Sequence, residues 1–336
     1  MSARKTYAIA GAAAAALGVL TGVGYRRFQH ELRGAQLRVV TGSAVADTAS
    51  GRIEYAQQGD GDPLLIVHGA GGGFDQGLLF ARGLVDRGFR VTAMSRFGYL
   101  RTPLPEDASA QAQADAHASL LDSLQIRETT VIGASAGAPS ALQFAIRHPQ
   151  RCRALVLLVP LTWAPGNVLR SVHRPARIAE LMLRWLVMSD AVYWMALRVA
   201  RGAVIETILG TPPSLVKAAD RSEQARIDEV LRSVFPLSQR AAGLKNDARV
   251  AASLTRYALE EVRVPTLVIA LRDDLYGMYA GAQYTAEHIP GARFVHYDHG
   301  GHLWVGHQDA LLETVASFAH ERQEAKCSRA GGDYRL

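Results

Sequence analysis

The sequence has few cysteines and few lysines, and each shortage excludes classes of protein. Its two cysteines, Cys152 and Cys327, form neither a CxxC motif nor a pair at metal-binding spacing, so a disulfide framework and a cysteine-based metal site are not expected. The two cysteines do not decide whether the protein resides in an oxidising or a reducing compartment. Only four of the 37 basic residues are lysines, and no run of Lys and Arg with interleaved aromatics occurs. The net charge of +6 is therefore spread along the chain, and we expect no nucleic-acid partner.

The remaining composition is that of an ordinary globular protein. Hydrophobic residues make up 49% of the 336 residues and charged residues 20%. A chain of this length has room for one large α/β domain, or for a domain with an insertion.

One long stretch, residues 7–25, carries no charge at all. Nineteen helical residues rise about 28 Å, close to the thickness of a bilayer core. Arginine or lysine stands on both sides, at Arg4-Lys5 and Arg26-Arg27. We therefore predict a membrane protein with a single-pass, uncleaved anchor within residues 1–33, of undecided orientation. A cleaved signal peptide and an Ala-rich helix that does not span remain alternatives.

Short apolar runs alternate with amphipathic stretches along the rest of the chain, which is typical of strands that alternate with helices. This alternation predicts an α/β fold, a mostly parallel sheet with helices on both faces. The predicted strands are 36–41, 52–56, 64–67, 90–93, 129–133, 153–159, 265–271 and 293–297, and the predicted helices are 76–87, 108–124, 136–147, 280–288 and 308–322.

The strand pattern stops between about 161 and 247, where helical stretches such as 178–188 and 191–201 replace it. We predict an inserted helical cap there. The chain then divides into an N-terminal segment 1–33, a core in two parts (34–160 and 248–322), the cap 161–247, and a polar, disordered tail 323–336. Large side chains in the cap either line a substrate pocket or form the cap's own core: Met182, Trp185, Met188, Tyr193 and Trp194.

The five residues Gly133–Gly137, with Ser135 at their centre, stand between a predicted strand and a predicted helix. A serine at a sharp strand-to-helix turn has an exposed hydroxyl and neighbouring backbone N–H groups that are free. The two glycines fit the crowding that such a turn imposes. A second small-residue loop, 68–73, follows the strand at 64–67, and we interpret its backbone N–H groups as part of an oxyanion hole.

With these motifs, the chain resembles the α/β-hydrolase superfamily over roughly residues 52–320. The resemblance rests on His68-Gly69, on the turn at Gly133–Gly137, on Arg272-Asp273-Asp274 after the strand at 265–271, and on Gly301-His302. The family uses the chain order serine, acid, histidine. Residues 236–240 with Gly243 and Asp247 also look like the family's return from cap to sheet. Residues 95–99 stand where many members place a turn led by aspartate, and we assign them no role.

The resemblance and the chemistry of acyl transfer together imply roles for six residues. Ser135 would be the nucleophile, His302 the base and later the acid, and Asp274 the partner that orients the imidazole. The backbone N–H of Ala136 and that of Ala70 or Gly71 would form the oxyanion hole. No cofactor and no metal is implied.

Three alternatives for these roles stay open. Asp273 would replace Asp274 as the acid if the register slipped by one residue, because the glycine usual in the family is Leu271 here. Asp298 is a competing acid. A metal cluster of His299, His302 and His307 is conceivable, although no HxxxH spacing or suitable carboxylate supports it.

The sequence therefore predicts a membrane-anchored serine hydrolase that cleaves a carboxylic ester of a small-molecule acyl substrate through an acyl-enzyme. One alternative is hydrolysis of a carbon–carbon bond on the same residues. Another is a non-catalytic ligand-binding protein with the same fold. The oligomeric state and the acyl and alcohol specificity are left undecided.

Overall fold

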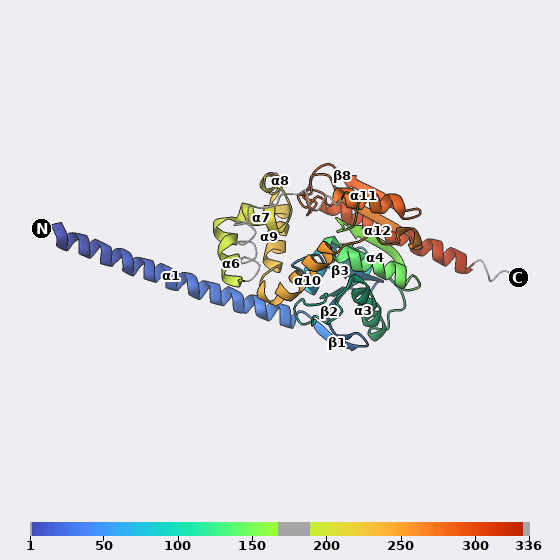
Figure 1. The fold of residues 1–336 in the computed structure, drawn as a ribbon, viewed down its shortest axis with the longest axis horizontal. Coiled ribbons are helices and arrows are strands. Elements are labelled where there is room, and N and C mark those ends of the chain that lie inside the picture. The colour runs from blue at the N-terminus through green and yellow to red at the C-terminus, as the bar shows by residue number, and fades with distance from the viewer. Residues whose placement is uncertain (1, 167–188, 332–336) are drawn as a thin grey trace.

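The computed structural model describes the backbone of residues 2–166 and 189–331, and side chains within 21–166 and 189–321. Its centre is an eight-stranded sheet in the order β1-β2-β4-β3-β5-β6-β7-β8 (Figure 1). β1 pairs with β2, and β2 with β4, in antiparallel fashion; every other pair is parallel. The strands are β1 (Ala44–Thr48), β2 (Gly51–Gln58), β3 (Asp62–Val67), β4 (Phe89–Met94), β5 (Thr129–Ala134), β6 (Cys152–Leu158), β7 (Thr266–Leu271) and β8 (Arg293–Tyr297).

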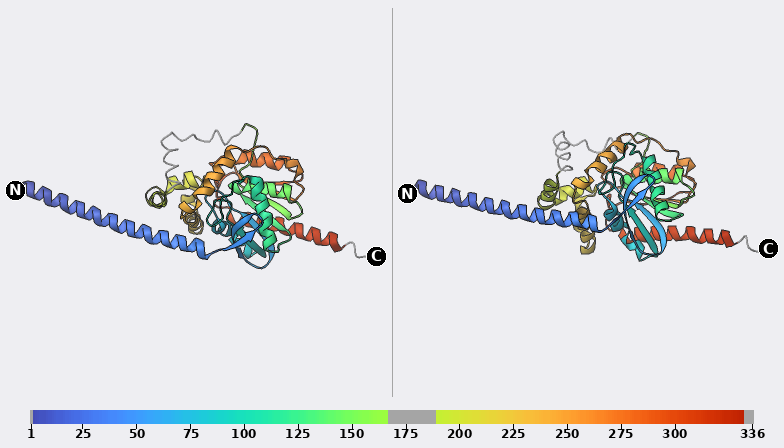
Figure 2. Two further views of the ribbon diagram at one scale, coloured as in Figure 1. Left: turned by 60° about the horizontal axis from the view of Figure 1, so that its bottom comes forward. Right: turned by 90° about the horizontal axis from the view of Figure 1, so that it is seen from below.

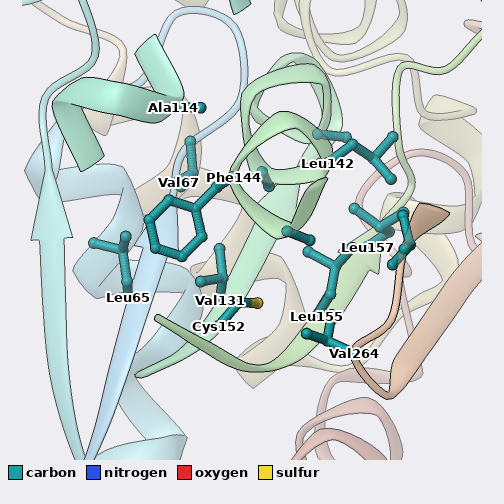
Figure 3. Packing of buried hydrophobic residues seen from close by; sticks show 14 of the residues in the cluster. Leu65, Val67, Ala114, Val131, Leu142, Phe144, Cys152, Leu155, Leu157 and Val264 are labelled. Carbon is teal, nitrogen blue, oxygen red and sulfur yellow. The ribbon is translucent and has the colours of Figure 1, made fainter. Parts of the chain in front are cut away.

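Helices cover both faces of this sheet, which confirms the predicted fold class. On one face lie α3 (Ala110–Ser123), α4 (Ala138–Arg147) and α11 (Tyr279–His288), and on the other lie α2 (Phe74–Val85) and α12 (Gln308–Gly331). Leu65 and Val67 of β3 point into the first layer, where they pack near Phe144 of α4 (Figure 3). Leu64 and Ile66 point into the second layer. Both faces are buried, so these strands are continuously apolar.

The segment between β6 and β7 contains helices and no strand among its described residues. The α-helices described there are α6 (Asp190–Val199), α7 (Arg201–Ile208), α8 (Pro213–Ala218), α9 (Arg221–Ser233) and α10 (Ala241–Ala252). Tyr193 and Trp194 pack into an apolar cluster with residues of α7 to α9. The predicted helix 178–188, with Met182, Trp185 and Met188, lies outside the described residues.

The predicted strand at 36–41 is wrong, because these residues end a long helix, α1 (Ser2–Thr41). Ala35 and Val39, four residues apart, are buried on one side of the helix, whereas Leu37 and Val40 are exposed. This spacing of buried residues is helical. The helix extends away from the rest of the molecule at its N-terminal end (Figures 1 and 2).

The predicted membrane anchor, and with it the membrane localisation, is corrected by the structure. No helix in the described part of the chain is long and apolar enough to cross a bilayer. Beyond Tyr25, α1 continues through charged side chains such as Arg26, Arg27 and Glu31, and its C-terminal part packs on the protein. Residues 7–20 of the predicted span lie outside the part of the chain whose side chains are described.

The tail also differs from the prediction. Helix α12 continues to Gly331, so most of the segment 323–336 that was expected to be disordered is helical. Residues 321–326 contain neither proline nor glycine and read Glu-Arg-Gln-Glu-Ala-Lys, all of which favour a helix.

Candidate active site

Ser135 occupies the sharp turn between β5 and the helix that follows it. Its φ of 48° lies in the left-handed region, which few non-glycine residues adopt. A Cβ on Gly133 would lie 2.5 Å from the Cβ of Ala141, and one on Gly137 would lie 2.4 Å from the carbonyl oxygen of Val67. Both glycines are therefore required by close packing, and the strained turn presents the serine hydroxyl above the sheet.

His302 and Asp274 come from the loops after β8 and β7 and meet the serine. The Nε2 atom of His302 lies 2.9 Å from Ser135 Oγ, and its Nδ1 atom lies 2.7 Å from Asp274 Oδ2. Asp274 and His302 are 7% and 6% exposed. Three residues predicted from separate motifs thus form one continuous hydrogen-bonded chain.

The other acidic candidates have different contacts. Both carboxylate oxygens of Asp273 accept hydrogen bonds, from the backbone N–H groups of Gly300 (3.1 Å) and Gly301 (2.8 Å). Asp298 forms an exposed ion pair with Arg272. The side chain of His299 is 80% exposed and lies 3.7 Å from Asp273. In the part of the chain that the structure describes, no group of three metal-ligating side chains is placed to hold an ion.

One carbonyl of the cap segment binds both loops that carry Asp274 and His302. The carbonyl oxygen of Gly210 accepts hydrogen bonds from the N–H of Leu275 (3.0 Å) and from the N–H of His302 (3.2 Å). A Cβ at Gly210 would collide with the ring of Tyr276, at 2.6 Å. The same tyrosine ring packs edge-on against His302, with 4.8 Å between the ring centroids. The cap therefore takes part in placing the imidazole.

The loop after β3 faces Ser135 and supplies candidate oxyanion donors. The N–H of Gly71 donates to the hydroxyl of Tyr99 at 3.2 Å. The N–H groups of Ala70 and Ala136 have no hydrogen-bond partner among the described residues, and both residues line the cavity beside Ser135. Of the two loop residues that the sequence suggested, Ala70 has the donor available for a ligand.

His68, at the start of this loop, is a buried structural residue. Its Nε2 accepts from the N–H of Arg96 at 3.0 Å, so its Nδ1 carries the proton and donates to the carbonyl of Gly69 at 2.7 Å. Burial, and then the nearby charge of Arg96, lower the pKa of His68 well below its usual value. The imidazole therefore stays neutral and holds the loop.

A cavity of about 710 Å³ opens above Ser135 and His302. Its described lining is mostly aliphatic and comes from both the core and the cap, for example Val159, Leu161, Leu209, Val230, Val234 and Leu244. Polar lining is sparse. Asp247 lines the wall but is paired with Arg96, and Gln76 is buried with its Oε1 unpartnered within the described structure. The nucleophile thus lies at an apolar chamber large enough for a drug-sized ligand.

Comparison with known proteins agrees with this architecture. The sequence model of the family described as alpha/beta hydrolase fold matches residues 62–186. A solved structure, an alpha/beta hydrolase fold protein from Nakamurella multipartita, superposes with a TM-score of 0.62 at 28% identity, over 82% of this chain and 98% of that one. The chain belongs to the α/β-hydrolase superfamily.

Two curated relatives of this α/β-hydrolase cover most of both chains. One is the uncharacterized hydrolase YcgS of Bacillus subtilis, 26% identical over 274 residues, which cover 79% of this chain and 93% of that protein. The other is 2-hydroxy-6-oxo-6-phenylhexa-2,4-dienoate hydrolase of Comamonas testosteroni, 25% identical over 279 residues, or 82% and 86% of the two chains. The protein is accordingly a hydrolase of this fold.

Sequence reasoning missed several residues around the site of this α/β-hydrolase. Arg96 and Tyr99 both contact Asp247 of α10, and Arg240, wholly buried, pairs with Asp75 at 2.8 Å. One signal was available: an arginine in the mostly apolar stretch 93–100 needs a buried partner, and Asp247 belongs to the segment that resembles the family's return from the cap.

Proposed function

We propose that this protein is a serine hydrolase that cleaves a carboxylic ester of an apolar acyl group through an acyl-enzyme. Ser135 is the nucleophile, His302 is the general base and later the general acid, and Asp274 orients the imidazole. The observation that carries the proposal is the placement of His302 between Ser135 Oγ, at 2.9 Å, and Asp274 Oδ2, at 2.7 Å. This is the geometry that activates a serine hydroxyl.

The reaction follows from these contacts. His302 Nε2 takes the hydroxyl proton as Ser135 Oγ attacks the ester carbonyl carbon, and the carbonyl oxygen becomes an oxyanion. The N–H groups of Ala70 and Ala136 stabilise that charge. The imidazolium then gives its proton to the leaving alcohol as the ester C–O bond breaks. Water, activated by the same imidazole, hydrolyses the acyl-enzyme.

The cavity supports an uncharged, apolar acyl group. No lysine or arginine occurs among the described residues that line it, and its only carboxylate, on Asp247, is held by Arg96. Against these described residues, a free carboxylate on the substrate would lose its hydration without gaining a cation in return. An aliphatic acyl chain has no charge to desolvate and gains the contact of the surrounding side chains.

Carbon–carbon bond hydrolysis is the second candidate function. It is favoured by the relative from Comamonas testosteroni, whose name describes a hydrolase of an oxo-dienoate. Such a substrate carries a carboxylate, and the described lining offers no cation for it. We therefore rank this activity below ester hydrolysis.

The domain bounds predicted from the sequence are kept as a proposal. We propose core segments 34–160 and 248–322, a cap at 161–247 and separate N-terminal and C-terminal segments at 1–33 and 323–336. The successive helices α6 to α10 between β6 and β7 support a cap in this part of the chain, and α10 (Ala241–Ala252) continues past the proposed bound at 247.

Two assays test the function. A fluorophosphonate should label the wild type at Ser135 and leave Ser135→Ala unlabelled; an unlabelled wild type would contradict a serine hydrolase and favour a ligand-binding protein. A series of p-nitrophenyl esters of increasing chain length, run beside a 2-hydroxy-6-oxo-dienoate, separates the two enzyme functions. Faster turnover of the dienoate than of every ester would reverse our ranking.

A further inference from the structure

We infer that Tyr99 is a positioning residue for the oxyanion hole, and that helix α10 of the cap segment holds it in place through Asp247. The inference rests on the proposed function and adds to it a physical connection between the cap and the oxyanion loop, residues 68–73. Tyr99 belongs to the segment 95–99, which has no role assigned from its sequence.

The hydroxyl of Tyr99 bridges the oxyanion loop and the cap. It accepts a hydrogen bond from the N–H of Gly71, at 3.2 Å, and donates its own proton to Asp247 Oδ2, at 2.5 Å. A phenol has one proton, so the acceptor contact with Gly71 requires that the proton point at Asp247. The bridge takes the N–H of Gly71 away from the cavity and leaves that of Ala70 to face the substrate.

Arg96 fixes the carboxylate at the far end of this bridge. Its guanidinium binds both oxygens of Asp247, at 2.6 and 2.7 Å, in a fork geometry that restricts the carboxylate's rotation. The same guanidinium donates to the carbonyl oxygens of His68 (2.9 Å) and Gly69 (3.2 Å). One buried arginine therefore holds the cap aspartate and the base of the oxyanion loop together.

The ionisation state of Tyr99 suits this bridge. Burial, and then the adjacent Asp247 charge, raise the pKa of Tyr99 well above its usual value. The hydroxyl keeps its proton throughout the neutral and mildly alkaline range. It can therefore donate to Asp247 and accept from Gly71 wherever the enzyme is assayed.

Two glycines let the tyrosine ring lie directly on the backbone of α10. The N–H of Gly243 donates to the carbonyl of Gly98 at 2.9 Å. A Cβ on Gly243 would stand 2.1 Å from the ring of Tyr99. The close approach leaves no side chain between the ring and the helix, so a shift of α10 moves Tyr99 and, through its hydroxyl, Gly71.

The test compares Tyr99→Phe with a matched control, Tyr193→Phe. Tyr193 is also fully buried, and its hydroxyl donates to the carbonyl of Leu231 at 2.7 Å, within the cap's own apolar cluster. We expect Tyr99→Phe to slow fluorophosphonate labelling of Ser135, and to lower kcat for a p-nitrophenyl ester, by roughly tenfold, with KM changed less than twofold. The control should keep wild-type values of all three quantities.

The outcomes separate this inference from the proposed function. If the wild type is labelled and Tyr99→Phe is labelled equally fast, the inference is overturned and the function stands. If the wild type is not labelled, both fail. Should Tyr99→Phe not fold, Gly243→Ala replaces it: the added methyl displaces the ring but keeps the hydroxyl, and we expect the same loss of kcat at unchanged KM. Wild-type labelling by a folded Gly243→Ala would equally overturn the inference.

Discussion

Asp273 and Asp274 are neighbours in the sequence, yet their carboxylates hold two different parts of the loop that carries His302. Asp274 Oδ2 accepts from the imidazole Nδ1, whereas Asp273 accepts from the backbone N–H groups of Gly300 and Gly301. One aspartate therefore orients the ring, and the other shapes the backbone that presents it.

This difference gives a paired prediction. Asp274→Asn should lower kcat by about 10⁴-fold, because an amide that donates to the ring favours the wrong imidazole tautomer. Asp273→Asn should lower it by about tenfold or less, since one amide oxygen can still accept from the loop. Steady-state kinetics on a p-nitrophenyl ester measures both, with circular dichroism as the control for folding. The opposite ranking would assign the acid to Asp273.

The backbone strain at Ser135 predicts a difference in stability between two inactive variants. Ser135→Ala and Ser135→Gly should both lower ester hydrolysis by about 10⁶-fold, because neither offers a nucleophile. Ser135→Gly should nevertheless be the more stable of the two, with a free energy of unfolding about 1 kcal/mol larger than that of Ser135→Ala, since glycine adopts the φ of 48° without strain. Urea denaturation of the two variants compares them directly. Equal midpoints would mean that the turn stores no strain.

The buried side chain of His117 predicts how the stability of the fold depends on pH. Burial lowers the pKa of His117 from 6.5 to about 3. Between these values the unfolded chain binds a proton that the folded chain does not, so stability is lost as the pH falls through this range. His117→Gln should therefore show a slope of unfolding free energy against pH that is shallower by about 1.4 kcal/mol per unit between pH 6 and 4. Parallel slopes for the two proteins would show that His117 is protonated in the folded state.

The C-terminal part of α1 should stabilise the cap. Phe28 packs against Trp194, whose indole N–H donates to Glu31 at 2.9 Å, and Val39 is buried. Deletion of residues 1–41 should therefore cost on the order of 3 kcal/mol of stability, whereas deletion of residues 1–24 retains these contacts. Thermal unfolding of both truncated proteins decides this. Equal melting temperatures would mean that the packing of α1 contributes nothing.

The sequence predicts most of the core because its signals are local. The strands at 64–67 and 129–133 are continuous apolar runs, and the structure places both in the centre of the sheet with each face covered. The turn at Gly133–Gly137 is also a local pattern, and the family order of motifs then pointed to Asp274 and His302. Their roles remain predictions until the variants above are assayed.

What the sequence did not predict depends on contacts between distant segments. Residues 36–41 alternate like a strand, and only the packing of Ala35 and Val39 on the rest of the protein selects a helix. The bridge from Tyr99 to Asp247 joins residues 148 positions apart, across a close approach of two backbones. No local pattern in either segment indicates the other.

The carbonyl of Gly210 has a consequence for the exchange of caps between relatives. Because it accepts from the N–H of both Leu275 and His302, the cap supplies part of the framework that aligns the base. A cap transplanted from another member would bring new pocket walls but would also have to provide a carbonyl at this point. Chimeras built only to alter substrate preference should therefore lose turnover first, and the loss would be repaired at the position of Gly210, inside the grafted cap, rather than in the pocket walls.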